Sequence, residues 1–220
     1  QARARLDADT SLRDDFEQAY PNLDVPVVYG AYDDVPRSLI ERIDECDAMV
    51  ATLYASVGAL REVARAPGGD RLAFGYYIQD FEPYFFEPGG DDFHHAWQSY
   101  RLLEDIVRFT KTEWNQRELQ TLVGVDSVLV GPSLDVDLFR PRPAATAERP
   151  LRVAAMIRPE SKYRSPRLTM EVLAAASAHF GGAIEIVLFG AAPGDPAFRA
   201  LPAPFPYRMA GVLGPRHMAR

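Results

Sequence analysis

The sequence predicts an α/β protein in which two units with mostly parallel sheets follow one another along the chain. Short apolar runs of strand length alternate with helix-length segments over most of the 220 residues, and this alternation is typical of parallel sheets whose strands are joined by helices. It stops once, in a proline-rich segment at 140–150, and then starts again. We therefore predict a first domain at 1–141 that is incomplete at its start, a linker at 142–150, and the beginning of a second domain at 151–220.

In the first domain, five apolar runs are predicted strands, and the segments between them are predicted helices. In chain order the elements are strand 25–29, helix 37–45, strand 48–53, helix 56–65, strand 74–79, helix 92–103, strand 106–110, helix 112–123 and strand 127–130. Thr112 is a favourable N-cap, and Gly124 is the kind of residue that ends a helix. Both ends of the last helix are therefore marked in the sequence.

The second domain repeats the pattern. A strand at 151–157, a helix at 166–180 and a strand at 184–189 are followed by a Pro/Gly-rich loop, a strand at 207–212 and the start of a helix after Gly214. Ser165 is expected to cap the helix at 166–180, with Pro166 at its first position and Gly181 beyond its end. The chain is therefore expected to contain two Rossmann-like units.

Composition and charge exclude several classes of protein. The net charge is −7, from 24 basic and 31 acidic residues without long single-sign runs, so neither nucleic acid nor an anionic membrane is expected as the main partner. At most, peripheral membrane contact is expected. Cys46 is the only cysteine, which excludes an intrachain disulfide and fits a reducing compartment.

No apolar run approaches the roughly 20 residues that span a bilayer, and residues 1–5 are not followed by a signal-peptide core. We expect a cytoplasmic protein. The chain starts without Met and stops where a helix begins, which suggests a piece of a longer protein.

Residues 72–90 combine a buried strand with a polar and aromatic end. Gln79, Asp80, Glu82 and Tyr84 follow the apolar run closely, among phenylalanines. Aromatic rings can cover the C–H faces of a polyhydroxylated ligand while carboxylates accept its O–H groups. The alternative is a loop whose aromatic residues pack under the sheet while its acids face water.

A cluster of basic residues follows the first strand of the second domain. Arg158, Lys162, Arg164 and Arg167 lie before or at the start of the helix at 166–180, where free N–H groups and the helix dipole favour a phosphate. The alternative is a solvated basic loop. Gly190, after the strand at 184–189, would let a ligand approach the backbone, although a simple turn would also favour glycine.

Motifs for other chemistries are missing. The sequence contains no Gly-x-Gly-x-x-Gly after either first strand, no P-loop and no Gly-x-Ser-x-Gly. Asp135 and Asp137 lack further carboxylates nearby in the sequence, and His94 and His95 point about 100° apart on a helix. We therefore expect no metal and no cofactor.

Four segments together resemble a known family. They are Tyr77–Phe85, Thr110–Trp114 at the opening of a helix, Val130–Pro141, and Met156–Pro159. In this order they are similar to GT-B glycosyltransferases of family 4, and Gln79–Pro83 is most similar to rhamnosyltransferase-like enzymes of bacterial surface polysaccharides.

This resemblance implies two Rossmann-like domains facing across a cleft. The first would bind a glycan or lipid-linked acceptor and the second a nucleoside-diphosphate sugar, with a dTDP-deoxyhexose as one candidate. The enzyme would be a retaining hexosyltransferase that needs no metal. The family's glycine-rich loop and Glu-x7-Glu motif are expected outside this chain, so its catalytic residues are unknown and the fragment alone is expected to be inactive.

The resemblance also assigns roles to individual residues. Arg158 resembles the first basic residue on the donor diphosphate and Arg164 the second, with Lys162 or Arg167 as substitutes. Gly190, Val212 and Leu213 would lie near the nucleotide, and Gln79, Asp80, Glu82 and Tyr84 on the acceptor side. The alternatives are a non-catalytic glycan- or nucleotide-binding module of the same shape and a nucleotide-sugar epimerase.

Overall fold

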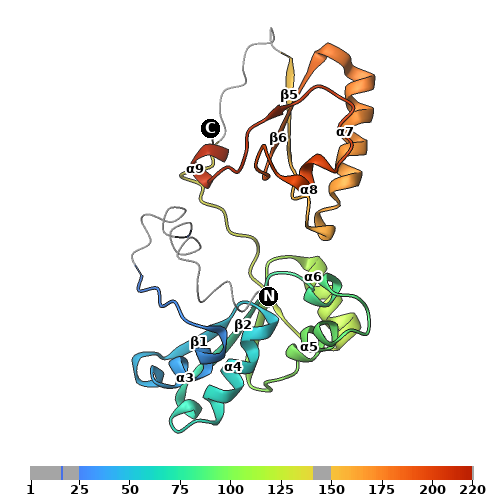
Figure 1. Cartoon of the computed structure of the whole chain (residues 1–220). Coiled ribbons are helices and arrows are strands. Elements are labelled where there is room, and N and C mark those ends of the chain that lie inside the picture. Colours follow the sequence, from blue (N-terminus) through green and yellow to red (C-terminus); the bar gives the residue numbers. More distant parts are fainter. Residues whose placement is uncertain (1–15, 17–24, 141–149, 220) are drawn as a thin grey trace. The chain divides into compact units, whose positions relative to one another are not determined.

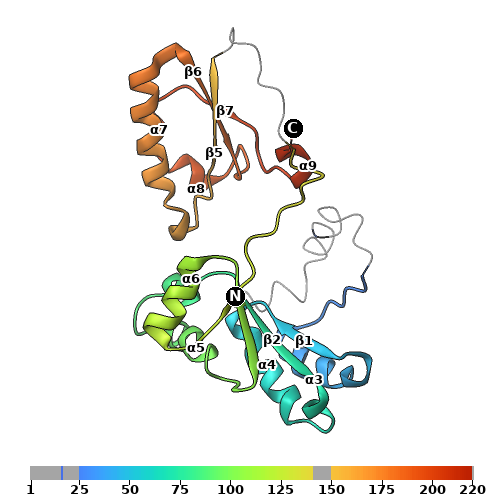
Figure 2. The ribbon, with the colours of Figure 1, turned by 180° about the vertical axis from the view of Figure 1, so that it is seen from behind.

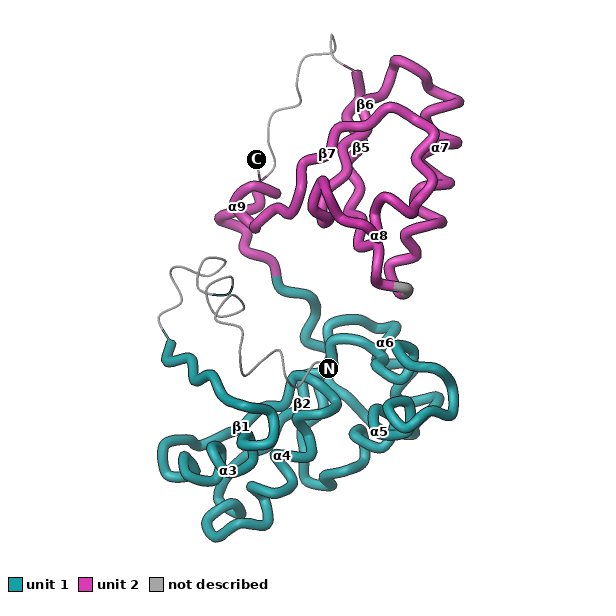
Figure 3. Tube along the Cα trace, in the orientation of Figure 1, with its two compact units in different colours: residues 1–133 teal, residues 134–220 magenta. Residues whose placement is uncertain are grey.

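The structure is a computed structural model that describes residue 16 and residues 25–140 and 150–219. It divides into two compact units, residues 1–133 and 134–220 (Figure 3). Nearly all of the linker predicted at 142–150 lies outside the described residues.

Unit 1 contains a four-stranded parallel sheet (Figure 1). Its strands, in spatial order as in the sequence, are β1 (Ala48–Ala51), β2 (Ala73–Ile78), β3 (Ile106–Thr110) and β4 (Val128–Leu129). The main helices are α3 (Val35–Ile40), α4 (Tyr54–Arg65), α5 (Asp91–Ser99) and α6 (Glu113–Glu118), and α6 continues as a π-helical turn, η5 (Leu119–Val123). The predicted alternation of strands and helices is confirmed from β1 onward.

The core of unit 1 lies on one face of this sheet. Phe74, Tyr76 and Ile78 alternate along β2 and are buried together with Leu60 of α4 and Leu119 of η5. On the opposite face, Val50, Val107 and Val128 are at least half exposed. Gly75 lies in register with Val50 and Val107, and a Cβ atom at this position would come within 3.1 Å of the side chains of Val50 and Phe109.

The predicted ends of the last helix of unit 1 are confirmed. Thr112 Oγ1 accepts a hydrogen bond from Asn115 N at 3.1 Å, which satisfies one of the free N–H groups of the first turn. Gly124 ends the helical segment with φ +71°, a left-handed conformation that glycine adopts without strain.

Unit 2 contains a three-stranded parallel sheet (Figure 2). Its strands are β5 (Leu151–Met156), β6 (Ile184–Phe189) and β7 (Arg208–Met209), and its helices are α7 (Pro166–Phe180), α8 (Pro196–Arg199) and α9 (Pro215–Met218). Ile157, Met170, Leu173 and Leu188 are among the buried residues of its own hydrophobic cluster. The ranges predicted for α7 and β6 agree with the structure residue for residue.

Several elements differ from the predictions. Residues 25–29 form no strand, because they are exposed and pair with no described strand, and Pro26 has no N–H to donate. The helix predicted at 37–45 is the shorter α3 followed by a separate 3-10 turn, η2 (Ile43–Glu45). The helix predicted at 92–103 ends at Ser99, and the strand predicted at 207–212 has only two residues.

Two local features were not predicted correctly. Ser165 occupies the N-cap position of α7, but it has φ +44° and its side chain forms no capping hydrogen bond. The Pro/Gly-rich loop after β6 contains α8, because Asp195 Oδ1 accepts from Ala197 N and Phe198 N. Pro196 then occupies the first helical position, which suits its fixed φ.

Within the described part of the chain, no helix combines the length and the apolar character needed to cross a membrane.

Candidate functional site

The chain directly after β2 lies at the carboxyl end of the unit 1 sheet, where ligands bind in open parallel sheets. Gln79 is exposed, and its Nε2 donates to Thr52 O, which follows β1, at 3.4 Å. Its carbonyl oxygen accepts from Asn115 Nδ2 of α6 at 3.1 Å. Asp80 is half-buried, and its Oδ1 accepts from Phe81 N at 3.2 Å. The two hydrogen bonds of Gln79 therefore link the chain after β2 to Thr52 after β1 and to Asn115 in α6.

Glu82 points into the interior of unit 1. The residue is only 4% exposed, and its Oε2 accepts from Tyr54 N at 2.7 Å and from Tyr76 Oη at 3.4 Å. Its own N–H donates to Tyr100 Oη at 3.0 Å. Because Tyr54 is the first residue of α4, the carboxylate caps that helix from 28 positions away.

Burial raises the pKa of the Glu82 carboxyl to about 7, although the hydrogen bonds from Tyr54 and Tyr76 act in the opposite direction. The same burial raises the pKa of Tyr76 and of Tyr100. The structure thus places Glu82 in a buried network with Tyr76 and Tyr100, away from solvent.

The aromatic residues that follow β2 divide into a buried and an exposed group. Phe81 is buried and stacks on Tyr100 with ring centroids 5.5 Å apart. Tyr84 is 52% exposed, and its hydroxyl donates to Glu118 Oε2 at 2.6 Å. Its ring centroid lies 6.1 Å from that of Trp114, which is 43% exposed.

Trp114 and Glu118 were not among the predicted site residues. Their spacing of four positions on α6 places them on one face of the helix, and this was the signal that the sequence offered. The hydrogen bond to Glu118 raises the pKa of the Tyr84 hydroxyl, since an ionised tyrosine could no longer donate it.

The predicted phosphate site of unit 2 lies after β5. Arg158, Arg164 and Arg167 are exposed, and none of their guanidinium groups forms a hydrogen bond or ion pair with a described residue. Lys162 opens a 3-10 turn, η6 (Lys162–Arg164). The loop is held by Ser161, whose N–H donates to Arg158 O and whose carbonyl accepts from Arg164 N, both at 3.1 Å.

The three strand ends of unit 2 lie next to one another at this edge. Ile157 N donates to Phe189 O at 2.7 Å, and Gly190 N donates to Gly211 O at 2.8 Å. The chain segments that carry Arg158, Gly190 and Val212 therefore leave the sheet side by side.

Gly190 has a structural requirement of its own. It has φ +96°, and a Cβ atom would come within 2.9 Å of Ile157 O and of Met156 Cγ. Glycine is therefore needed for the close approach of the chain after β6 to the end of β5. Val212 is exposed and Leu213 half-buried.

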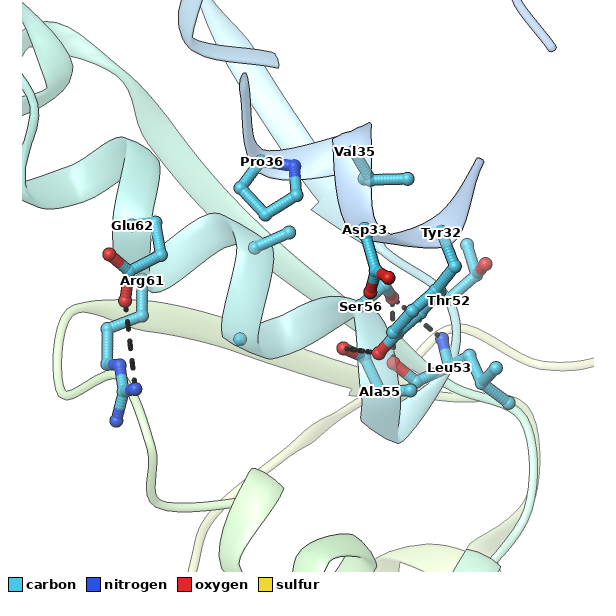
Figure 4. Close-up of a pocket in the computed structure, with 12 residues that line it drawn as sticks. Tyr32, Asp33, Val35, Pro36, Thr52, Leu53, Ala55, Ser56, Arg61 and Glu62 are labelled. Atoms are coloured by element: carbon cyan, nitrogen blue, oxygen red, sulfur yellow. Dashed lines mark hydrogen bonds and ion pairs between the residues drawn. The ribbon is translucent and has the colours of Figure 1, made fainter. Parts of the chain in front are cut away.

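A pocket of about 560 Å³ lies beside α4 in unit 1 (Figure 4). Its lining residues come from Tyr32–Pro36, from Thr52 and Leu53 after β1, and from α4. Tyr32 Oη donates to Ala55 O at 2.9 Å across it. Small residues, Gly58 among them, line part of the pocket, and none of the lining residues was among the predicted site residues.

Within the described ranges, no group of three or more His, Cys, Asp and Glu side chains is arranged to hold a metal ion. Asp135 Oδ1 accepts from Asp137 N and Leu138 N, which makes it part of a turn. Asp137 Oδ1 pairs with Arg140 Nη2 at 2.7 Å.

No model of a protein family matches the chain. The chain is 30% identical over 146 residues to the O-antigen biosynthesis protein RfbC of Myxococcus xanthus, a match that covers 66% of this chain and 11% of that protein. The chain thus spans about a tenth of this curated relative.

The structure is similar to sucrose-phosphate synthase from Thermosynechococcus elongatus, with a TM-score of 0.58 and 12% identity. This match covers 90% of the chain and 55% of that protein. The predicted fold class is confirmed: the chain has the α/β architecture of the GT-B fold, with a parallel sheet in each of two Rossmann-like units.

Proposed function

We propose that this chain is part of a glycosyltransferase that acts in the synthesis of a surface polysaccharide. Unit 2 binds a nucleoside-diphosphate sugar, for which a dTDP-deoxyhexose is one candidate, and unit 1 binds a glycan or lipid-linked acceptor. The GT-B fold class and the similarity to an O-antigen biosynthesis protein support this proposal. The resemblance to family 4 implies transfer with retention, and we propose that it takes place in the cytoplasm.

One observation carries the proposal. Arg158 and Arg164 on the loop between β5 and α7, and Arg167 in the first turn of this 15-residue helix, carry guanidinium groups without a described partner. Arg167 opposes the helix dipole from this first turn, so a bound anion would remove an unfavourable arrangement. A diphosphate is an anion that Arg binds in bidentate geometry.

The same cations would act in the reaction. When the bond between the sugar and the diphosphate breaks, negative charge develops on the departing nucleoside diphosphate. Guanidinium groups that are already in place stabilise this charge without reorganisation, so no divalent cation is required for this step.

Isothermal titration calorimetry of UDP, GDP and dTDP tests the proposal. Arg158→Ala and Arg164→Ala should each weaken binding of the preferred nucleotide about tenfold, because each removes a charge-assisted contact. Arg152→Ala, near the start of β5 rather than beyond its end, is the control and should leave the affinity unchanged. Unchanged affinity in both test variants would contradict the proposal.

Adding EDTA to the same titration tests whether guanidinium groups or a metal ion bind the diphosphate. We expect the affinity to be unchanged, since the guanidinium groups supply the positive charge. A loss of binding that Mg²⁺ restores would show that a metal ion carries the interaction instead.

A further inference from the structure

Unit 1 has a pair of neighbouring aromatic rings that are both exposed. Tyr84 and Trp114 are 52% and 43% exposed, and their ring centroids lie 6.1 Å apart at an interplanar angle of 43°. Single exposed aromatic residues are common, whereas two exposed rings in contact offer a stacking surface to a ligand.

Contacts within unit 1 fix the positions of the two rings. Tyr84 contacts the buried ring of Phe81 edge-on at 4.9 Å, and its hydroxyl donates to Glu118 Oε2. Trp114 and Glu118 both belong to α6, whose first turn is capped by Thr112. A surface that is already ordered loses little conformational entropy when it binds a ligand.

The position of the rings is that of a ligand site. Tyr84 follows β2 and Trp114 follows β3, and these strands are parallel neighbours. The rings therefore lie where chain leaves the carboxyl edge of the sheet, the edge that binds ligands in such folds.

The charges in this region select the class of ligand. Glu118 accepts a hydrogen bond from Tyr84, and Asp80 and Glu113 are further acids on the same two connections, where acidic residues outnumber basic residues such as Lys111. This excess of negative charge disfavours a diphosphate. A neutral sugar fits, because aromatic rings cover its C–H faces and a carboxylate accepts its hydroxyl groups.

We propose that Tyr84, Trp114 and Glu118 form a stacking subsite for one sugar ring of the acceptor glycan. This inference rests on the proposed transferase function and adds the residues that hold the acceptor. Tyr84 and Trp114 supply the stacking surface, and Glu118 both orients Tyr84 and accepts from the sugar.

Fluorine NMR of the 220-residue chain labelled with 5-fluorotryptophan tests this subsite. The chain has two tryptophans, and Trp97→Phe assigns the two signals. The probes are methyl α-L-rhamnoside, methyl α-D-mannoside, methyl β-D-galactoside and a microarray of bacterial oligosaccharides. We expect the Trp114 signal to shift saturably with at least one glycoside, while the Trp97 signal stays in place.

The variants separate stacking from hydrogen bonding. Tyr84→Ala should weaken binding of the responding glycoside about tenfold, because it removes one stacking face. Glu118→Gln keeps an oxygen acceptor but loses the charge, and should weaken binding less. Phe180→Ala changes an exposed ring at the end of α7 in unit 2, and should have no effect.

Two results would overturn the subsite. One is a Trp114 signal that none of the glycosides shifts, together with no binding to any oligosaccharide on the microarray. The other is a Trp114 signal whose position changes with protein concentration and not with added glycoside. This would show that the two rings form a contact between protein molecules. If either occurs while Arg158→Ala still weakens nucleotide binding, the transferase proposal stands and only the subsite is lost. If the glycoside binds but no nucleotide does, the subsite stands and the transferase proposal fails.

Discussion

Glu82 shows how a residue type that suggests a ligand can instead serve the fold. Its carboxylate is buried and accepts a hydrogen bond from the first N–H group of α4. A charge in such a position is stabilised by the helix dipole but penalised by the loss of hydration. The loss of hydration outweighs the stabilisation by the helix dipole, since the pKa of this group is raised to about 7.

The raised pKa of Glu82 predicts how stability depends on pH. The folded protein holds this proton up to about pH 7, whereas the unfolded chain releases it near the ordinary glutamate pKa of 4.5. The contribution of Glu82 to the free energy of unfolding therefore falls as pH rises from about 4.5 to about 7, and is constant outside that range.

Glu82→Gln removes this titration but keeps an acceptor for Tyr54 N. The variant should gain stability relative to the wild type as pH rises through this range, by on the order of 3 kcal/mol in total. Urea denaturation of both proteins at several pH values measures the difference. Glu104→Gln, at an exposed position, serves as the control. If the difference in the free energy of unfolding between the variant and the wild type does not change with pH, burial does not raise the pKa of Glu82.

Gly190 can be tested in the same way at the residue scale. Gly190→Ala should destabilise unit 2 by about 3 kcal/mol, since the added methyl group meets Ile157 O and the backbone has a positive φ. Gly182→Ala is the matched control, because no atom lies within 4 Å of its added Cβ. Thermal denaturation compares the two, and equal melting temperatures would contradict this account of Gly190.

At the scale of elements, the predictions were most accurate where local signals agree with burial. β3, β6 and α7 agree with their predicted ranges, and each combines a continuous apolar pattern with residues that mark its ends. Residues 25–29 have strand composition but no described strand beside them. Strand formation depends on a partner, and composition alone does not supply one.

The N-cap of α6 offers a test at this scale. Thr112→Ala should lower the free energy of unfolding by about 1 kcal/mol, because Asn115 N loses its acceptor. Thr112→Ser should retain most of the stability, and Thr121→Ala, at an exposed position in η5, should have little effect. Chemical denaturation measures all three, and equal losses in the Ala and Ser variants would rule out capping as the cause.

At the scale of the whole molecule, the described residues form two separate hydrophobic clusters, one in each unit. Leu188→Ala should destabilise unit 2 by about 3 kcal/mol, since this side chain is fully buried. Hydrogen exchange should then become faster in β5 and β6 and remain unchanged in β2. Leu60→Ala in α4 should instead make hydrogen exchange faster in β2 and leave it unchanged in β5 and β6. Faster exchange throughout the chain in either variant would show that the units unfold together.

The sequence by itself determined the α/β class, most strands and helices, and the basic cluster beyond β5, because these depend on periodicity, capping residues and charge over short stretches of chain. Only the tertiary structure decided which polar and aromatic residues are accessible. Glu82 and Tyr84 are two positions apart, yet one is buried at the N-terminus of α4 and the other is 52% exposed beside Trp114. The physical reason is that burial and pairing depend on residues distant in sequence, here Tyr54 for Glu82 and Trp114 for Tyr84.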